Sequence, residues 1–314
     1  MPSPAVLGAA VAERTERVRI GVGVSVLPLL HPLRVAEDYA MLDVLSDGRL
    51  DLGVGRGYQP REFDIFEVDQ SLSRERFGEC LDVVLGLWSG EPFSYHGEFF
   101  NFDDVQLFPQ PVQQPAPIHI AAVSTPSFKI AAERGLSIMT TPALLPMAAL
   151  KDAIVGGVRE MVSLGHEPES INFSVSMVVH VAPTEEAARE AATPAVDFQF
   201  ERALRQTPGF GKSAPRGYEE YEAAMREMGD GEVPPLEGLA ALGNILVTDP
   251  KGASSLIQEL RDDVGLRNFG CLMNTGGMEP ELVLRSMKLF AEEVMPAFED
   301  DPPMPSNVLA GATR

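Results

Sequence analysis

Cysteine, basic residues and long apolar runs are all scarce in this sequence of 314 residues. Its two cysteines, Cys80 and Cys271, lie far apart, with no CxxC or Cys/His spacing around them. This excludes a disulfide framework and a thiolate metal site, and it is typical of a reducing compartment. We therefore expect a cytoplasmic protein that binds no metal.

Basic residues are also few. The chain has 25 Lys and Arg residues against 46 Asp and Glu residues, which gives a formal net charge of −21. Nucleic acids and anionic membranes are bound through clustered Lys and Arg, so the acidity argues against both as partners. No apolar run reaches the roughly 18 residues of a membrane-spanning helix, and the N-terminal residues lack the pattern of a signal peptide.

The remaining composition is that of a folded protein, with 45% hydrophobic and 23% charged residues. Short β-branched runs alternate with helical patterns, which predicts a parallel sheet covered by helices; a closed barrel and an open doubly wound sheet both fit this periodicity. A hairpin is expected over 93–108. The predicted strands are 18–27, 50–57, 117–122, 137–141, 172–181 and 267–274. The predicted helices are 32–45, 71–88, 126–135, 146–164, 184–206, 249–264 and 280–298.

Two segments interrupt this alternation. Residues 207–243 are rich in Gly and Pro, and a long irregular insertion of this kind indicates a functional lid or a disordered segment. Residues 300–314 are Pro-rich and are expected to form a flexible tail. We therefore predict one α/β domain over 1–299, interrupted by a lid at 207–243.

Candidate ligand positions follow from the sheet, because ligands of parallel α/β proteins bind at the carboxyl ends of the strands. Glycines in Gly21-Val22-Gly23-Val24-Ser25 indicate close approach of a ligand or of another backbone, and tight strand packing explains them equally well. The segment 53–58 has GxGxG spacing, which is not the dinucleotide fingerprint. Its Arg56 stands where it could reach an anion or form a surface ion pair.

A third candidate is Ser124-Thr125-Pro126-Ser127, which follows a predicted strand and opens a helix. Such a helix start either caps itself or binds an anion through its free N–H groups. If Arg56 and Arg74 converge on it, a phosphate-bearing cofactor becomes the best interpretation. No HExxH, GxSxG or Walker sequence occurs, each of the five histidines fits a structural role better than a catalytic one, and no catalytic residue is assigned.

These motifs resemble one known family. LPLLHPLRVAEDYAMLDVLSDGRLDLGVGRGYQPREFDIF, then SRERF, then LFPQPVQQPAPIHIAAVSTPS are similar to segments of the bacterial-luciferase-like flavin-dependent monooxygenases, and RSMKLFAEEVMPAF is similar to their last helix. The resemblance implies a TIM (β/α)8 barrel that uses reduced FMN and O2 to oxidise an aldehyde or another small organic molecule. Because no NAD fingerprint is present, it also implies a separate flavin reductase.

The resemblance also implies roles for individual residues. Gly23-Val24 matches the place of a non-prolyl cis peptide beneath the flavin ring, and residues 207–243 match a lid. The residues that the resemblance places at the cofactor are Gly23, Val24, Gly55, Arg56, Gly57, Tyr58, Arg74, Ser124, Thr125 and Ser127, of which Arg56, Arg74, Ser124 and Ser127 match positions that hold its phosphate.

The sequence departs from the family at its start. The family begins with a strand, a helix and a second strand, and this chain resembles it only from the third strand onward. We therefore expect a barrel that lacks its first two strands, which agrees with six predicted strands instead of eight. Two alternatives stay open, namely an F420-dependent oxidoreductase on the same fold and a non-catalytic flavin-binding partner subunit. Relatives commonly pair as homodimers.

Overall fold

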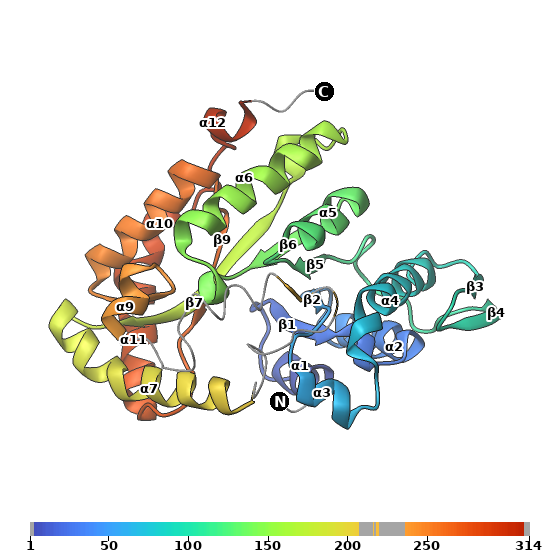
Figure 1. Ribbon diagram of the computed structural model, residues 1–314, viewed down its shortest axis with the longest axis horizontal. Helices are drawn as coiled ribbons and strands as arrows, with labels where there is room; N and C mark the ends of the chain where they lie inside the picture. The colour runs from blue at the N-terminus through green and yellow to red at the C-terminus, as the bar shows by residue number, and fades with distance from the viewer. Residues whose placement is uncertain (1–2, 207–215, 217, 220–235, 311–314) are drawn as a thin grey trace. The chain divides into compact units, whose positions relative to one another are not determined.

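The computed structural model describes residues 3–206, 216, 218–219 and 236–310 (Figure 1). The chain divides into two compact units. The first unit comprises Met1–Ala121 with Pro215–Gly217, and the second comprises Ala122–Ala214 with Tyr218–Arg314. Most of the predicted lid, 207–243, lies outside the described residues.

The first unit is built on three parallel strands. They are β1 (Ile20–Val26), β2 (Leu50–Gly55) and β5 (Ile118–Ala121), and β2 pairs with both of the others. Helix α2 (Pro32–Leu45) packs on α4 (Ser73–Leu87) and on β2, while α1 (Pro4–Ala12) packs on α2 and β1. The sequence analysis predicted all of these elements except α1.

Helix α4 shows why the apolar repeats in the sequence predicted helices. Its apolar stripe of Phe77, Leu81, Val84 and the C-cap residue Trp88 is buried, with none of the four more than 6% exposed. The indole Nε1–H of Trp88 donates to the carbonyl of Ala36 at 3.0 Å, which ties α4 to α2. The predicted stripe is confirmed, because a helical repeat of apolar residues is buried on one face.

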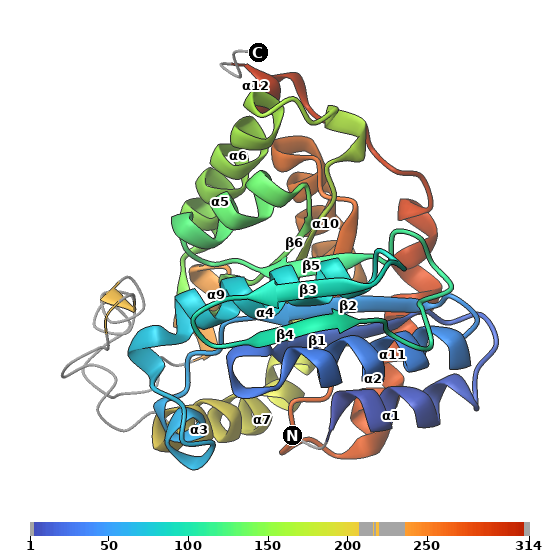
Figure 2. The same ribbon diagram turned by 90° about the vertical axis from the view of Figure 1, so that its right-hand side faces the viewer.

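Two excursions leave the sheet of the first unit. Helix α3 (Pro60–Ile65) and a 3₁₀ turn at Gln70–Leu72 follow β2. The antiparallel hairpin of β3 (Phe93–His96) and β4 (Asn101–Val105), seen lengthwise in Figure 2, confirms the hairpin predicted over 93–108.

The second unit contains four parallel strands in three lateral positions. They are β6 (Ser137–Thr140), β7 (Phe173–Val181), β8 (Ile245–Thr248) and β9 (Asn268–Leu272). Ser174 of β7 pairs with both β6 and β9, and Val178 pairs with both β8 and β9. Since a strand residue has one neighbour on each side, β6 and β8 share one side of β7 and β9 takes the other. The described residues of the two units thus contain seven parallel strands where six were predicted, because the short β8 was missed.

The helices of the second unit follow the predicted order. Helix α5 (Thr125–Arg134) packs on α6 (Met147–Ser163), and α6 also contacts α10 (Pro250–Val264) and α12 (Ser306–Leu309) (Figure 1). The last predicted helix, 280–298, ends at Glu293 and continues as a 3₁₀ turn at Met295–Phe298, where Pro296 cannot continue the helical hydrogen bonds. The helices are α5 (Thr125–Arg134), α6 (Met147–Ser163), α7 (Glu185–Gln206), α9 (Leu236–Ala241), α10 (Pro250–Val264), α11 (Pro280–Glu293) and α12 (Ser306–Leu309).

The segment after residue 300 contains α12, which is held on α6. Arg159 donates from Nε to the carbonyl of Val308 and from Nη2 to that of Asn307, both at 2.9 Å. The Val308 side chain is fully buried. Among the described residues, no helix is long and apolar enough to cross a membrane.

Candidate functional site

The carboxyl half of β1 contains a non-prolyl cis peptide bond between Gly23 and Val24. The pairing of β1 with β2 shifts here, from Val22 opposite Leu52 to Ser25 opposite Val54. The cis bond that the family resemblance implies is therefore confirmed. Gly23 also lines a cavity of about 340 Å³ together with residues of α1 and the start of β1.

Atoms of the neighbouring strand β1 fill the space where side chains would stand at the glycines of β2 and of the turn after it. A Cβ on Gly53 would lie 2.0 Å from the carbonyl oxygen of Val22, and one on Gly55 would lie 2.8 Å from Cγ2 of Val24. Gly57 has φ +80°, which favours glycine, and its Cβ would lie 2.6 Å from Cγ1 of Val26. Close strand packing thus accounts for these glycines, and any contact of Gly55 or Gly57 with a cofactor would be through the backbone.

Two arginines flank this strand end in the first unit. Arg56 follows directly after the last residue of β2, and Arg74 stands in the first turn of α4; both are half-buried. Gln70 Nε2 donates to the carbonyl of Tyr58 at 3.3 Å, which supports the loop that follows Arg56, and Tyr58 is 42% exposed. The convergence of Arg56 and Arg74 on one anion stays a prediction.

The start of α5 brings two predicted residues together in the second unit. Ser124 is the N-cap residue and is 6% exposed, yet its hydroxyl makes no capping hydrogen bond to the helix. It lies instead 3.1 Å from the hydroxyl of Ser127. The simple capping interpretation is therefore wrong for this side chain. Two paired hydroxyls and the N–H of Thr125 stand at the positive end of α5, which is a suitable arrangement for an anion.

One further hydroxyl near this place was missed by the sequence analysis. Thr140 ends β6 and is 2% exposed, and its Oγ1 has no hydrogen-bond partner among the described residues. The N–H of Ala122, two residues before Ser124, donates to the carbonyl of Met139 at 2.9 Å, so the approach to α5 lies beside the end of β6. The sequence did contain a signal for Thr140, namely a hydroxyl residue at the carboxyl end of an apolar strand.

The two cysteines and two of the histidines have surroundings that fit a structural role. Burial raises the pKa of the Cys80 thiol and of the Cys271 thiol to about 12, so neither is a thiolate near neutral pH. His31 accepts a hydrogen bond from the N–H of Leu33, and His166 bonds to the carbonyl of Ala132, which are structural contacts. Among the described residues, no group of three or more His, Cys, Asp and Glu side chains could hold a metal ion.

The sequence is similar to several flavin monooxygenases. It is 29% identical over 95% of this chain and 74% of the other to limonene 1,2-monooxygenase from Rhodococcus erythropolis. It is 28% identical over 95% of this chain and 81% of the other to the oxygenase component of the flavin-dependent trigonelline monooxygenase from Acinetobacter baylyi.

Solved structures show the same fold. The monooxygenase RslO1 from Streptomyces bottropensis superimposes with a TM-score of 0.78, at 29% identity over 95% of this chain and 83% of the other. The FMN complex of the oxygenating constituent of 3,6-diketocamphane monooxygenase from Pseudomonas putida gives 0.72, at 22% identity over 94% and 84%. Coenzyme F420-dependent tetrahydromethanopterin reductase from Methanopyrus kandleri gives 0.67, at 17% identity over 95% and 88%.

These likenesses assign the α/β fold of the luciferase-like barrels. Residues 1–265 match the family described as luciferase-like monooxygenase, which is most of the chain. The strand-end motifs, the cis bond at Gly23-Val24 and the match over residues 1–265 agree. This chain belongs to the luciferase-like monooxygenases, a family of flavin-dependent oxidoreductases.

Proposed function

We propose that this chain is the oxygenase of a two-component system, which uses reduced FMN and O2 to oxidise an aldehyde or another small organic molecule. Family membership supports flavin-dependent monooxygenation. The relative from Acinetobacter baylyi is an oxygenase component, which supports a separate reductase for this chain too. The paired hydroxyls of Ser124 and Ser127 are the observation that carries FMN binding.

The phosphate of FMN is assigned to four side chains and one backbone group. By the family resemblance, the guanidinium groups of Arg56 and Arg74 would bind the phosphate oxygens, which they match in geometry and charge. By the same resemblance, the hydroxyls of Ser124 and Ser127 and the N–H of Thr125 would donate hydrogen bonds to the phosphate. The residues present fit this group, because the Ser124 hydroxyl is buried at a helix start without capping the helix.

The flavin ring is assigned to the cis peptide Gly23-Val24 and to the segment Gly55–Tyr58. The ring would contact the backbone of this segment, because the Cβ positions of Gly55 and Gly57 face side chains of β1, and Tyr58 is exposed enough to cover one edge. The bound reduced flavin would supply the two electrons with which one atom of O2 enters the substrate and the other leaves as water. The residues assigned to the flavin would bind this cofactor, and the protein around it would orient the substrate and exclude water.

Paired titrations with FMN and riboflavin test the phosphate assignment, since the two differ only in the phosphate. Arg74→Ala and Ser124→Ala should each weaken FMN binding while riboflavin binding stays unchanged. A charge-assisted hydrogen bond is worth about 1.5–3 kcal/mol, so Arg74→Ala should cost about tenfold or more. The exposed Arg61 on α3 provides the control, because Arg61→Ala removes the same charge elsewhere in the first unit. Equal loss of both ligands would contradict the assignment.

Turnover separates the remaining alternatives. The protein mixed with an FMN reductase, NADH, O2 and a panel of aldehydes should consume oxygen and form carboxylic acids. Binding of F420 without binding of FMN would instead select the F420-dependent oxidoreductase. FMN binding without turnover, alone or with a second luciferase-like subunit, would select the non-catalytic partner.

A further inference from the structure

A cavity of about 330 Å³ lies wholly within the second unit, and none of the residues assigned to the flavin lines it. It is bounded by the end of β7, the first turns of α7 and the middle of α11. Its volume is at the lower end of the range of small-molecule sites, about 300–1,000 Å³. At roughly 30 Å³ per water-sized group, it holds on the order of ten non-hydrogen atoms.

Most of the cavity wall is apolar. Helix α7 contributes Ala187 and Ala191, which stand four residues apart and so share one face of the helix. Helix α11 contributes Leu282 and Leu289, which stand seven residues apart on one face. These four side chains are half-buried. A wall of small and branched apolar groups accepts an aliphatic or aromatic body and offers it no hydrogen bond.

The remaining part of the cavity wall includes polar side chains. His180 is only 3% exposed and lines the cavity, and its ring makes no hydrogen bond with the described part of the chain. The N–H of Val181 donates to Ser286 Oγ at 2.8 Å, which joins the end of β7 to α11 beside Arg285. Arg285 lines the same cavity and is exposed, and its guanidinium forms no ion pair among the described residues.

An unpartnered polar group that is this well buried is uncommon, because desolvating it without a hydrogen bond costs free energy. Burial lowers the pKa of His180, so the ring is neutral near pH 7 and offers one donor and one acceptor. A ligand whose polar end bonds to the imidazole and to Arg285 would satisfy both groups. Its body would cover the apolar wall.

We propose that this cavity binds a small monocarboxylate with an apolar body, with the carboxylate at Arg285 and His180 and the body against α7 and α11. The carboxylate is favoured over a neutral head group because the cation Arg285 lines the cavity.

Calorimetric titration with octanoate, which has ten non-hydrogen atoms, tests the proposal in the absence of flavin. One-to-one saturable binding is expected, with 1-octanol binding more weakly. Arg285→Gln should weaken octanoate about fivefold and leave octanol unchanged, since an exposed charge pair contributes modestly. Lys288→Gln is the matched control, because it removes one positive charge from the same helix at an exposed position that does not line the cavity. It should leave octanoate binding unchanged.

A substitution that fills the cavity provides a second test of octanoate binding. Ala191→Trp should abolish octanoate binding while FMN binding and the circular dichroism spectrum are retained. If that variant does not fold, nuclear Overhauser contacts between octanoate and the methyl groups of Ala187 and Ala191 in the unmodified protein take its place. Absence of octanoate binding, absence of these contacts, or equal weakening by Arg285→Gln and Lys288→Gln would overturn the proposal.

Discussion

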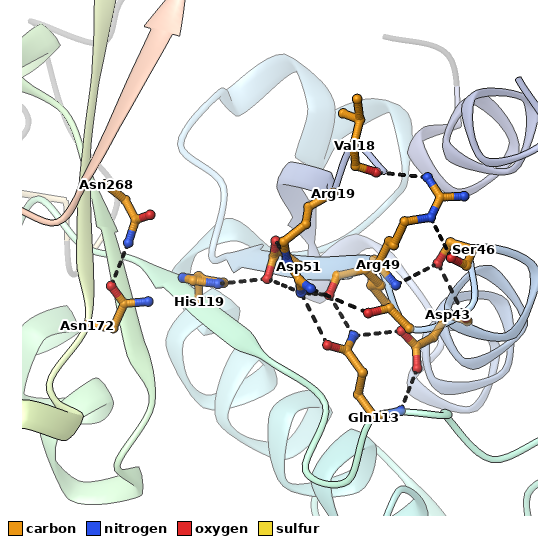
Figure 3. Close-up of polar contacts among 12 residues, drawn as sticks. Val18, Arg19, Asp43, Ser46, Arg49, Asp51, Gln113, His119, Asn172 and Asn268 are labelled. Atoms are coloured by element: carbon orange, nitrogen blue, oxygen red, sulfur yellow. Dashed lines mark hydrogen bonds and ion pairs between the residues drawn. The ribbon is translucent and has the colours of Figure 1, made fainter. Parts of the chain in front are cut away.

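The guanidinium of Arg19 donates two hydrogen bonds to the carboxylate of Asp51, from Nε to Oδ2 at 2.7 Å and from Nη2 to Oδ1 at 2.8 Å (Figure 3). His119 of β5 lies on the other side of that carboxylate, with Nε2 3.7 Å from Oδ1. Arg19 also donates to the carbonyl of Leu50 and to Gln113 Oε1. The three strands of the first unit are therefore joined by polar side chains as well as by the sheet.

This pair makes the first unit sensitive to acid. Burial alone would raise the pKa of Asp51, but His119 and Arg19 outweigh burial and lower it to about 2. Since this pKa lies below the value of 3.8 for a free carboxyl, the stabilisation is complete above pH 4 and is lost as the pH falls through 2. The side chain is 28% exposed, so the contribution is about 1 kcal/mol after screening by solvent.

Urea denaturation between pH 2 and pH 7 measures this effect. Asp51→Asn should lower the stability above pH 4 and flatten its acid dependence. Asp64→Asn, at an exposed position on α3, should leave the dependence as it is in the unmodified protein. The same acid dependence in the protein and in Asp51→Asn would refute the assignment.

A second prediction concerns Asp43, whose carboxylate is fully buried on α2. It accepts hydrogen bonds from the backbone N–H of Gln113 at 2.9 Å and from its Nε2 at 2.7 Å. Asp43→Ala leaves both donors without this acceptor, so the free energy of unfolding should fall by about 3 kcal/mol. A double-mutant cycle with Gln113→Ala measures the coupling, and additive losses would show that the two side chains act independently.

Two glycines of one strand pair offer a matched comparison. Gly53→Ala would place a Cβ 2.0 Å from the backbone carbonyl of Val22, and a backbone atom cannot move aside cheaply. The unfolding free energy should therefore fall by about 2 kcal/mol or more. Gly21→Ala meets no atom within 4 Å and should change stability by less than about 0.5 kcal/mol. Similar melting temperatures for both variants would contradict the close approach of β1 and β2.

The cysteines should be unreactive in the folded protein. Because burial raises the pKa of Cys80 and of Cys271 to about 12, a disulfide reagent at pH 8 should titrate neither thiol before unfolding and both in urea. The variant Cys80→Ala should titrate one thiol in urea. Rapid labelling of the native protein would show that these thiols are not held protonated.

The contact of Arg159 with α12 predicts local protection of the chain near residue 308. Arg159→Ala removes the donors to the carbonyls of Asn307 and Val308, so the amides of Leu309 and Ala310 should exchange hydrogen faster. Lys129→Ala removes an exposed positive charge on α5 and should leave that exchange unchanged. Unchanged exchange in Arg159→Ala would mean that Val308 alone holds the helix.

Local pattern predicted much of the fold, for a physical reason. Helix α2 occupies the predicted residues 32–45, because a repeat of apolar side chains has one helical face to bury. Strand β8 was missed because its four residues Ile245–Thr248 are too short for a periodicity signal and follow an irregular segment. Helix α1 was missed because its sequence, PAVLGAAVA, is apolar on all sides and shows no stripe.

The candidate site also contains residues that the sequence identified and one that it did not. Residue types and spacing identified Ser124 and Ser127, because four consecutive residues are enough to predict a helix start. They did not identify Thr140, whose hydroxyl matters only because the folded chain buries it at the end of β6.

Sequence alone determined the family, the βα order and the helix start at Ser124, since each depends on composition or on neighbours in the chain. Tertiary structure decided that the glycines of β2 serve the packing of β1 and that the Ser124 hydroxyl does not cap its helix. It also joined Asp43 to Gln113 and His180 to the cavity beside Arg285. Most of those relationships connect residues tens of positions apart, and only the folded chain brings such residues into contact.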